Sequence, residues 1–161
     1  MLAVLCLMIF FQMGRLFCTP DVTVADYDDY APSFRMEPLS MNTIDVVIHK
    51  QDGSTVKLLI KIPATALQLQ QGLMYVKKLD GYDGMLFDFG ENQFVNMWMK
   101  NTFIPPDMLF FDSNRKLAYI HENAVPHDET PIGCSKPVRY VLEIDGGRAK
   151  TLGISVGDGF K

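Results

Sequence analysis

The chain has 161 residues and a formal net charge of −4 at pH 7, which is the length of one domain with a tail. Residues 41–161 hold 14 acidic and 13 basic residues, so the acidic excess belongs to the shorter part of the chain before them. Nucleic-acid binding needs clustered lysine and arginine, and no such cluster is visible here, so we exclude nucleic acid as the main partner.

The first 18 residues are strongly apolar, since 15 of them are hydrophobic. The run from Leu2 to Met13 is too short for a bilayer span, which needs about 20 residues, but it has the length of a signal-peptide core. We predict a signal peptide or signal anchor over residues 1–18 and therefore export, with the domain periplasmic or anchored facing outside the cytoplasm. Cleavage between Cys18 and Ala25 and lipidation at Cys18 are alternatives, although the bulky Phe17 disfavours lipidation.

Residues 19–40 are predicted to be an acidic linker. Pro20, Pro32 and Pro38 interrupt regular structure, and five acidic residues face one arginine. Contact with a membrane is expected only through the segment that precedes this linker. The domain then spans residues 41–161, where Cys134 is the single cysteine, so no disulfide framework and no CxxC motif are expected.

The domain begins with the pattern of a β-hairpin. Ile44, Val46 and Ile48 occupy alternate positions, which indicates a strand, and residues 51–54 read Gln-Asp-Gly-Ser, a tight-turn sequence. Residues 56–62 return as a second strand. Pro63 then opens a predicted helix over residues 64–71, with Gly72 as its stop.

Short strands dominate the remainder. They are expected at residues 85–87, 94–99, 107–112, 116–121 and 140–144, followed by a helical turn at 148–152 and an extended end. No strand–helix–strand alternation is visible. We therefore predict a mainly β (α+β) fold: a small, mostly antiparallel, closed or partly closed barrel or sandwich of about seven strands with one or two short helices.

The most unusual segment contains the only tryptophan. Trp98 is followed by Lys100, Asn101 and Thr102, and Asp107 begins the next strand. An aromatic face with an ammonium, an amide and a carboxylate nearby is typical of a site for a small polar ligand or a glycan. The alternative is that Trp98 fills the core and the polar groups bond to their own turn.

Glu143 lies in the predicted strand 140–144 and faces away from Leu142. A half-buried acid near Lys100 or Arg139 would be of functional interest, whereas an exposed acid would not. A second hypothesis is therefore a hydrolase in which Asp107 or Glu143 acts as general base and Lys100 stabilises charge.

Methionines raise a third hypothesis. Met97 and Met99 would share one face of a strand, and thioethers suit Cu(I), so periplasmic Cu(I) handling is an alternative function. Methionine is also an ordinary core filler. The histidines and Cys134 match no metal-ligand spacing, so we predict neither a metal site nor a cofactor.

Six ordered motifs resemble domain-of-unknown-function family 192 (DUF192) over about residues 42–160. They are Gly72-Leu73-Met74, Gly84-Met85-Leu86-Phe87, Trp98 to Thr102, Ile104-Pro105 with Asp107, Tyr140 to Glu143, and Gly153 with Gly157-Asp158. The resemblance implies a compact β-rich domain, often exported in bacteria, and brings no established activity. Gln71 stands where the family typically has Arg, and Pro106 where it has Leu. If that Arg binds an anion in relatives, this chain has altered that contact.

The leading hypothesis is a non-catalytic ligand-binding or accessory module outside the cytoplasm. The ligand-binding candidates are Trp98, Lys100, Asn101, Thr102, Asp107 and Glu143. No activated nucleophile or metal triad can be assembled from the motifs, which favours binding over catalysis and leaves the question of an enzyme open. The sequence does not determine the oligomeric state.

Overall fold

The computed structural model describes residues 40–161, which contain the predicted domain. The predicted export segment with Cys18, and the predicted linker apart from Ser40, lie outside the described residues. Within the described part of the chain, neither helix has the length and apolar character that crossing a bilayer requires.

The described residues form nine β-strands and two short α-helices. In chain order they are β1 (Asn42–His49), β2 (Thr55–Ile62), α1 (Ala66–Gln71), β3 (Gly84–Gln93), β4 (Asn96–Met97), β5 (Pro106–Phe111), β6 (Leu117–His121), β7 (Ile132–Gly133), β8 (Val138–Asp145), α2 (Arg148–Thr151) and β9 (Gly159–Phe160). The predicted hairpins are present, since β1 pairs with β2 and β5 pairs with β6, both antiparallel.

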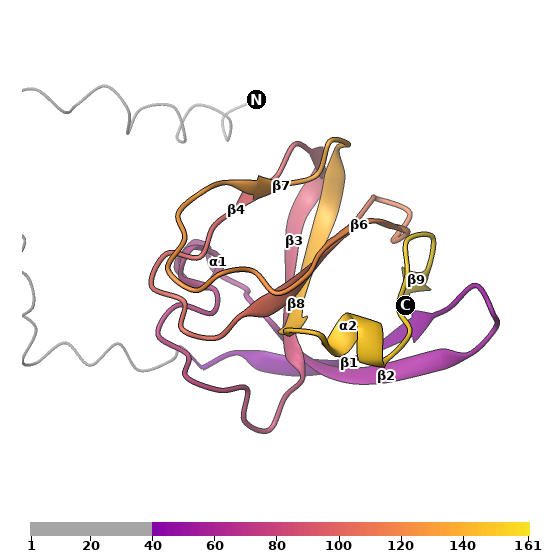
Figure 1. Ribbon diagram of the computed structural model, residues 1–161, viewed down its shortest axis with the longest axis horizontal. Helices are drawn as coiled ribbons and strands as arrows, with labels where there is room; N and C mark the ends of the chain where they lie inside the picture. The colour runs from indigo at the N-terminus through magenta and orange to yellow at the C-terminus, as the bar shows by residue number, and fades with distance from the viewer. Residues whose placement is uncertain (1–39) are drawn as a thin grey trace, which may run out of the picture. The chain divides into compact units, whose positions relative to one another are not determined.

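Seven strands form one sheet in the order β6-β5-β8-β3-β2-β1-β9, and β4 and β7 form a second, small sheet. The pairs are antiparallel except for β2 and β3, which run parallel because the chain returns through α1. In Figure 1, β3 and β8 stand side by side and β1 and β2 run across their ends. The mainly β, mostly antiparallel fold predicted from the sequence is confirmed.

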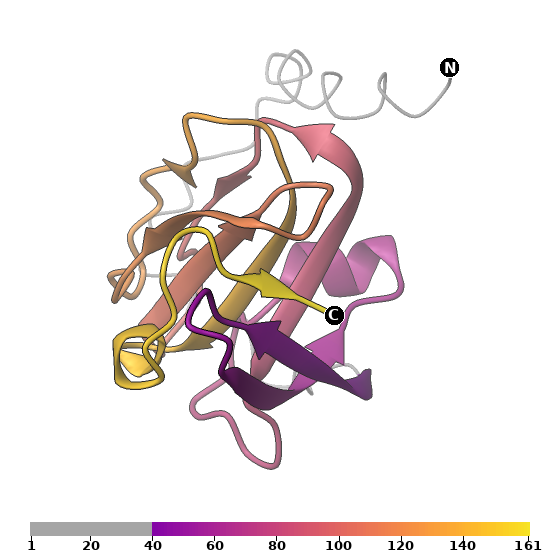
Figure 2. The ribbon, with the colours of Figure 1, turned by 90° about the vertical axis from the view of Figure 1, so that its right-hand side faces the viewer.

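The sheet curls until its two edges nearly meet. Gly159 of β9 bridges Lys116, and the Leu117 N–H donates to the Asp158 carbonyl oxygen at 2.8 Å. Figure 2 shows this C-terminal segment between β1 and the start of β6. The result is a partly closed barrel, the architecture that many short strands without helical crossovers favour.

Both faces of the sheet are covered by apolar side chains. All seven strands of the large sheet contribute to the cluster inside the curl, which includes Ile48, Leu142 and Phe160. A second cluster covers the other face of β3, β5 and β8 and includes Phe87 and Val141. Because side chains alternate along a strand, neighbouring residues of β5 and β8 belong to opposite clusters.

Two local expectations need correction. Helix α1 begins at Ala66, later than predicted, because Thr65 caps it: the Gln68 N–H donates to Thr65 Oγ1, and the Thr65 N–H donates to Gln68 Oε1. The strand predicted over residues 94–99 shortens to β4. The chain turns away after it, since the Met99 N–H donates at 2.9 Å to the carbonyl oxygen of Asp128.

Candidate functional site

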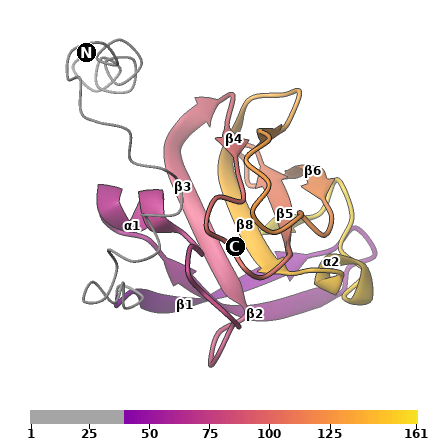
Figure 3. The ribbon, with the colours of Figure 1, turned by 60° about the vertical axis from the view of Figure 1, so that its left-hand side comes forward.

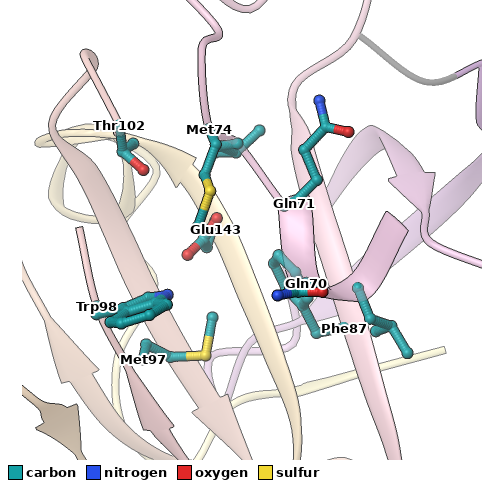
Figure 4. A pocket seen from close by; sticks show the side chains of 11 residues that line it. Gln70, Gln71, Met74, Phe87, Met97, Trp98, Thr102 and Glu143 are labelled. Atoms are coloured by element: carbon teal, nitrogen blue, oxygen red, sulfur yellow. The ribbon is translucent and has the colours of Figure 1, made fainter. Parts of the chain in front are cut away.

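Two adjoining cavities lie between α1 and the segment 97–102. The inner cavity measures about 40 Å³ and the outer cavity about 240 Å³. They share four lining residues, Gln70, Gln71, Met74 and Trp98, so they form one recess with a narrow inner end and a wide outer end. Figure 3 places α1 beside β3, and Figure 4 shows the side chains around the inner cavity.

The α1 wall of the recess is held close to the sheet by Gly72. This glycine ends α1 with a φ of 50°, and a Cβ atom there would lie 3.1 Å from the ring of Phe87. Only glycine adopts this conformation readily at such a close approach. The turn brings Gln70 and Gln71 before it, and Met74 after it, to the same recess. Gln71 is 7% exposed and is the buried residue of α1.

Glu143 lies at the inner end of the recess. Alternation along β8 places Leu142 inside the curl and Glu143 on the other face, where its neighbour Val141 packs in the second cluster. The residue is 4% exposed, and burial raises the pKa of its carboxyl to about 8. In Figure 4 the carboxyl points into the space between Met74 and Trp98. Near neutral pH the group is therefore largely protonated and can donate a hydrogen bond.

Trp98 and Lys100 form the opposite wall. Trp98 is 46% exposed and lines both cavities, so it presents a flat apolar surface to the recess. Lys100 lines only the outer cavity, and its Nζ lies 5.2 Å from the centroid of the Trp98 ring. The recess thus has a cation at its outer end and a carboxyl at its inner end.

Asn101 and Thr102 hold this wall in place. The Tyr75 N–H donates to the Asn101 carbonyl oxygen at 2.8 Å, and Asn101 Nδ2 donates to Tyr75 Oη at 2.9 Å. Both residues have positive φ, 66° for Tyr75 and 52° for Asn101, a conformation that costs energy outside glycine. Thr102 is buried, lines the inner cavity and donates from Oγ1 to the Lys100 carbonyl oxygen at 3.2 Å.

Asp107, another of the candidate residues, does not line this recess. It sits on the face of β5 inside the curl, fully buried, whereas Glu143 points to the opposite face. Its carboxylate accepts three backbone N–H bonds at 2.9 Å, from Asn123, Gly147 and Ala149. Two of these donors lie at the start of α2, so Asp107 ties that helix and a loop to β5.

The two methionines of the copper hypothesis lie in different environments. Met97 lines the inner cavity, whereas Met99 is 1% exposed and packs in the second cluster. The expected shared face requires a strand through both residues, and β4 ends at Met97. Within residues 40–161 there is no group of three or more His, Cys, Asp or Glu side chains that could hold a metal ion.

Sequence reasoning missed the α1 side of the recess. The overlooked lining residues are Leu67, Gln70, Gln71, Met74 and Tyr75. Gln71, which departs from the family pattern, lines the same cavity as Glu143. The available signal was the run Gln68 to Gln71 directly before a glycine, because amide side chains are among the few polar groups that orient a ligand in a small-molecule site.

Comparison with known proteins identifies the domain. The family model DUF192, described as an uncharacterized ACR, matches residues 46–161. A candidate transcription regulator from Sinorhizobium meliloti 1021, solved by crystallography, is 45% identical with a TM-score of 0.73, covering 76% of this chain and 95% of that chain. A protein of unknown function from Novosphingobium aromaticivorans DSM 12444 is 34% identical with a TM-score of 0.71, covering 78% and 89%. No curated protein matches. The chain belongs to the DUF192 family, as its motifs predict.

Proposed function

We propose that this domain is a non-catalytic module that binds one small polar molecule in the recess between α1 and the segment 97–102. The observation that carries the proposal is the combination of Trp98, 46% exposed in the wall of both cavities, with the buried Glu143 at the inner end. Apolar walls with a few convergent polar groups are the usual composition of small-molecule sites.

The size of the recess supports a small ligand. Drug-sized sites measure roughly 300–1,000 Å³, and the outer cavity at about 240 Å³ lies below that range. Gln70 and Gln71 lie along the shared wall and offer amide donors and acceptors, so the polar part of a ligand can be oriented there. A molecule the size of one sugar or one amino acid suits these dimensions better than an extended glycan.

The positions of Asp107 and Glu143 favour a binding function over a hydrolase. A hydrolase that used both Asp107 and Glu143 would need them in one cleft, but they occupy opposite faces of the sheet and Asp107 is saturated by backbone donors. Glu143 is the only carboxyl group among the residues that line the two cavities. Among these residues no second carboxylic acid completes a hydrolytic pair with Glu143.

The Sinorhizobium relative raises the question of a regulatory role, which a ligand-binding module could serve through a partner. Direct DNA binding is not favoured, because residues 41–161 carry 13 basic against 14 acidic residues. Export remains a proposal that rests on the apolar residues 1–18.

The test is a ligand screen on the full chain by two-dimensional NMR. The probes are single amino acids, primary amines, carboxylates, glucose and a disaccharide. We expect at least one class to shift the indole N–H signal of Trp98 and backbone signals of α1. Trp98→Ala should remove these shifts.

Phe94→Ala is the matched control, because Phe94 is an exposed aromatic residue that lines neither cavity. It should leave binding unchanged. The proposal is wrong if no probe class shifts these signals, or if Trp98→Ala binds the active probe as well as the unaltered protein does.

A further inference from the structure

The recess has an acidic side chain at one end and a basic side chain at the other. Glu143 lines only the inner cavity, and Lys100 lines only the outer cavity. None of the ion pairs among the described residues includes Lys100 or Glu143. Each group therefore meets the recess without a protein counter-charge from residues 40–161.

The surroundings of Glu143 are apolar or neutral on every side. Its cross-strand neighbours are Met85 on β3 and Met108 on β5. The α1 end and the opposite wall add neutral side chains, Gln70, Gln71, Leu73, Met74, Phe87, Met97, Trp98 and Thr102. Burying a carboxyl group without a partner costs free energy, and this cost is recovered when a ligand supplies the missing charge or hydrogen bond.

The two volumes limit what can enter each end. A cavity needs roughly 10–15 Å³ to admit a water-sized group, whereas one that takes benzene measures about 150 Å³. The inner cavity of about 40 Å³ therefore admits an ammonium group and excludes a ring. The outer cavity of about 240 Å³ has room for a short carbon chain against Trp98 and a second polar group near Lys100.

We propose, on the basis of the small-molecule function above, that the ligand is a zwitterion whose ammonium group enters the inner cavity beside Glu143 and whose carboxylate lies beside Lys100. A short ω-amino acid, whose two charged groups are separated by a carbon chain, has this chemistry. Trp98 contributes twice: its ring packs on the carbon chain, and its π-face stabilises a nearby cation.

Binding of the ammonium group should change the protonation of Glu143. The free protein holds Glu143 largely protonated near neutral pH, because burial raises its pKa to about 8. An entering ammonium group favours the carboxylate, so binding releases a proton from Glu143 to the solvent. The other ionisable groups of the recess are Lys100 and Tyr75, both in the outer cavity. Affinity should therefore rise with pH up to about 8, whereas a neutral hydrogen-bond acceptor would bind more weakly as pH rises.

The experiment is calorimetric titration of the full chain with four matched probes: 5-aminopentanoate, pentylamine, pentanoate and 1,5-pentanediol. We expect 5-aminopentanoate to bind at least about tenfold more tightly than the other three, since both charged contacts are made. Titration in buffers of different ionisation enthalpy should show proton release with 5-aminopentanoate and pentylamine.

Single substitutions test the Glu143 contact and the Lys100 contact separately. Glu143→Gln should weaken 5-aminopentanoate and pentylamine at least about tenfold and abolish proton release. Lys100→Gln should weaken 5-aminopentanoate to the level of pentylamine and leave pentylamine unchanged. Lys136→Gln, an exposed lysine outside both cavities, is the control and should change nothing.

The inference is overturned if pentanoate or 1,5-pentanediol binds best, if binding releases no proton, or if Glu143→Gln keeps full affinity. It is also overturned if glucose or the disaccharide binds in a Trp98-dependent manner while all four probes fail, an outcome that leaves the proposed function intact. Failure of every probe class, including those of the NMR screen, would overturn both.

Discussion

Two buried acidic residues on adjacent strands, Asp107 and Glu143, differ in whether the protein supplies hydrogen bonds to the carboxyl group. Asp107 is 0% exposed and its carboxylate accepts three backbone N–H bonds, so its charge is well compensated. Glu143 is almost as deeply buried, yet burial is the one cause that acts on its pKa. The first acid therefore stabilises the fold, whereas the second is costly to ionise and is available to a ligand.

Replacing Glu143 should change how stability depends on pH. The pKa of this carboxyl is about 8 in the folded protein and 4.5 as an unperturbed group, so between these values the folded state holds one proton more than the unfolded chain. The free energy of unfolding should fall by about 1.4 kcal/mol per pH unit as pH rises from about 5 to 8, and then level off. In Glu143→Gln this slope should disappear.

Urea denaturation at several pH values measures this slope. Glu91→Gln, which removes an exposed carboxyl, should keep the slope of the unaltered protein. Equal slopes in Glu143→Gln and the unaltered chain would contradict the burial of an unpartnered carboxyl.

Asp107→Ala should destabilise the fold rather than selectively abolish binding. It leaves three backbone N–H groups without an acceptor, which should lower the free energy of unfolding by about 3–5 kcal/mol. Asp112→Ala removes the acceptor of two N–H groups in an exposed turn and should cost about 1 kcal/mol. Chemical denaturation compares the two. A loss of probe binding at full stability in Asp107→Ala would return this residue to the site.

At the scale of elements, the recess depends on a contact between two turns. The turn after α1 and the turn that follows Trp98 are joined by the two hydrogen bonds between Tyr75 and Asn101. Both residues adopt positive φ, so the backbone is locally strained at this contact between the two turns. Tyr75 lines the outer cavity, so this contact lies at its wall.

Tyr75→Phe should loosen this contact without unfolding the domain. It removes the bond to Tyr75 Oη and should cost about 0.5–1 kcal/mol of stability. Hydrogen exchange of the residue-75 backbone N–H should become about fivefold faster, because local opening costs less. Tyr119→Phe, a comparably exposed tyrosine outside both cavities, is the control. Unchanged exchange would show that the backbone bond alone holds the turns.

The strands of the first hairpin could be predicted because alternation and an Asp-Gly turn are local signals, and β1 and β2 appear where residues 44–62 indicate them. The predicted helix start at residue 64 is too early because Pro63 is a weaker start signal than the capping box of Thr65 and Gln68. The strand around Trp98 was drawn too long, because the bond from Met99 to Asp128 that ends it joins distant parts of the chain.

Closeness in sequence also accounts for part of the arrangement of the candidate residues. Trp98, Lys100 and Thr102, which are close in sequence, line the recess, and Asn101 between them is hydrogen-bonded to Tyr75 of the outer cavity. The orientation of Glu143 also followed from alternation, but its burial depends on a second covering layer that no local pattern reveals. The role of Asp107 depends on donors 16, 40 and 42 residues away, which a strand pattern cannot identify.

At the scale of the whole domain, the large sheet separates the apolar cluster inside the curl from the recess, which lies on its other face. The cluster inside the curl is closed by β9, where the Phe160 ring packs edge-on against Phe111 and Tyr140 at centroid distances of 4.9 and 5.2 Å. The recess belongs to the opposite face and to the second cluster. The parallel pairing of β2 with β3, which the sequence did not predict, sets β3 and its Phe87 beside α1.

Phe160→Ala should therefore lower stability and spare binding. Truncating a buried aromatic side chain costs about 3–5 kcal/mol, and the edge-on contacts that close the curl would be lost. Val156→Ala, at an exposed position in the same C-terminal segment, should change stability by less than about 0.5 kcal/mol. Urea denaturation and probe titration below the unfolding transition measure both effects. Loss of binding in folded Phe160→Ala would mean that the two faces are coupled.

The most direct test of the central claim, that the recess ends on a buried carboxyl without a partner, is a ¹³C NMR titration of the Glu143 side chain in the full chain. We expect a pKa of about 8, and a lower value in Gln71→Arg, because that change places a cation in the wall of the same cavity. A pKa near the ordinary 4.5 in the unaltered protein, with no response to Gln71→Arg, would contradict the account.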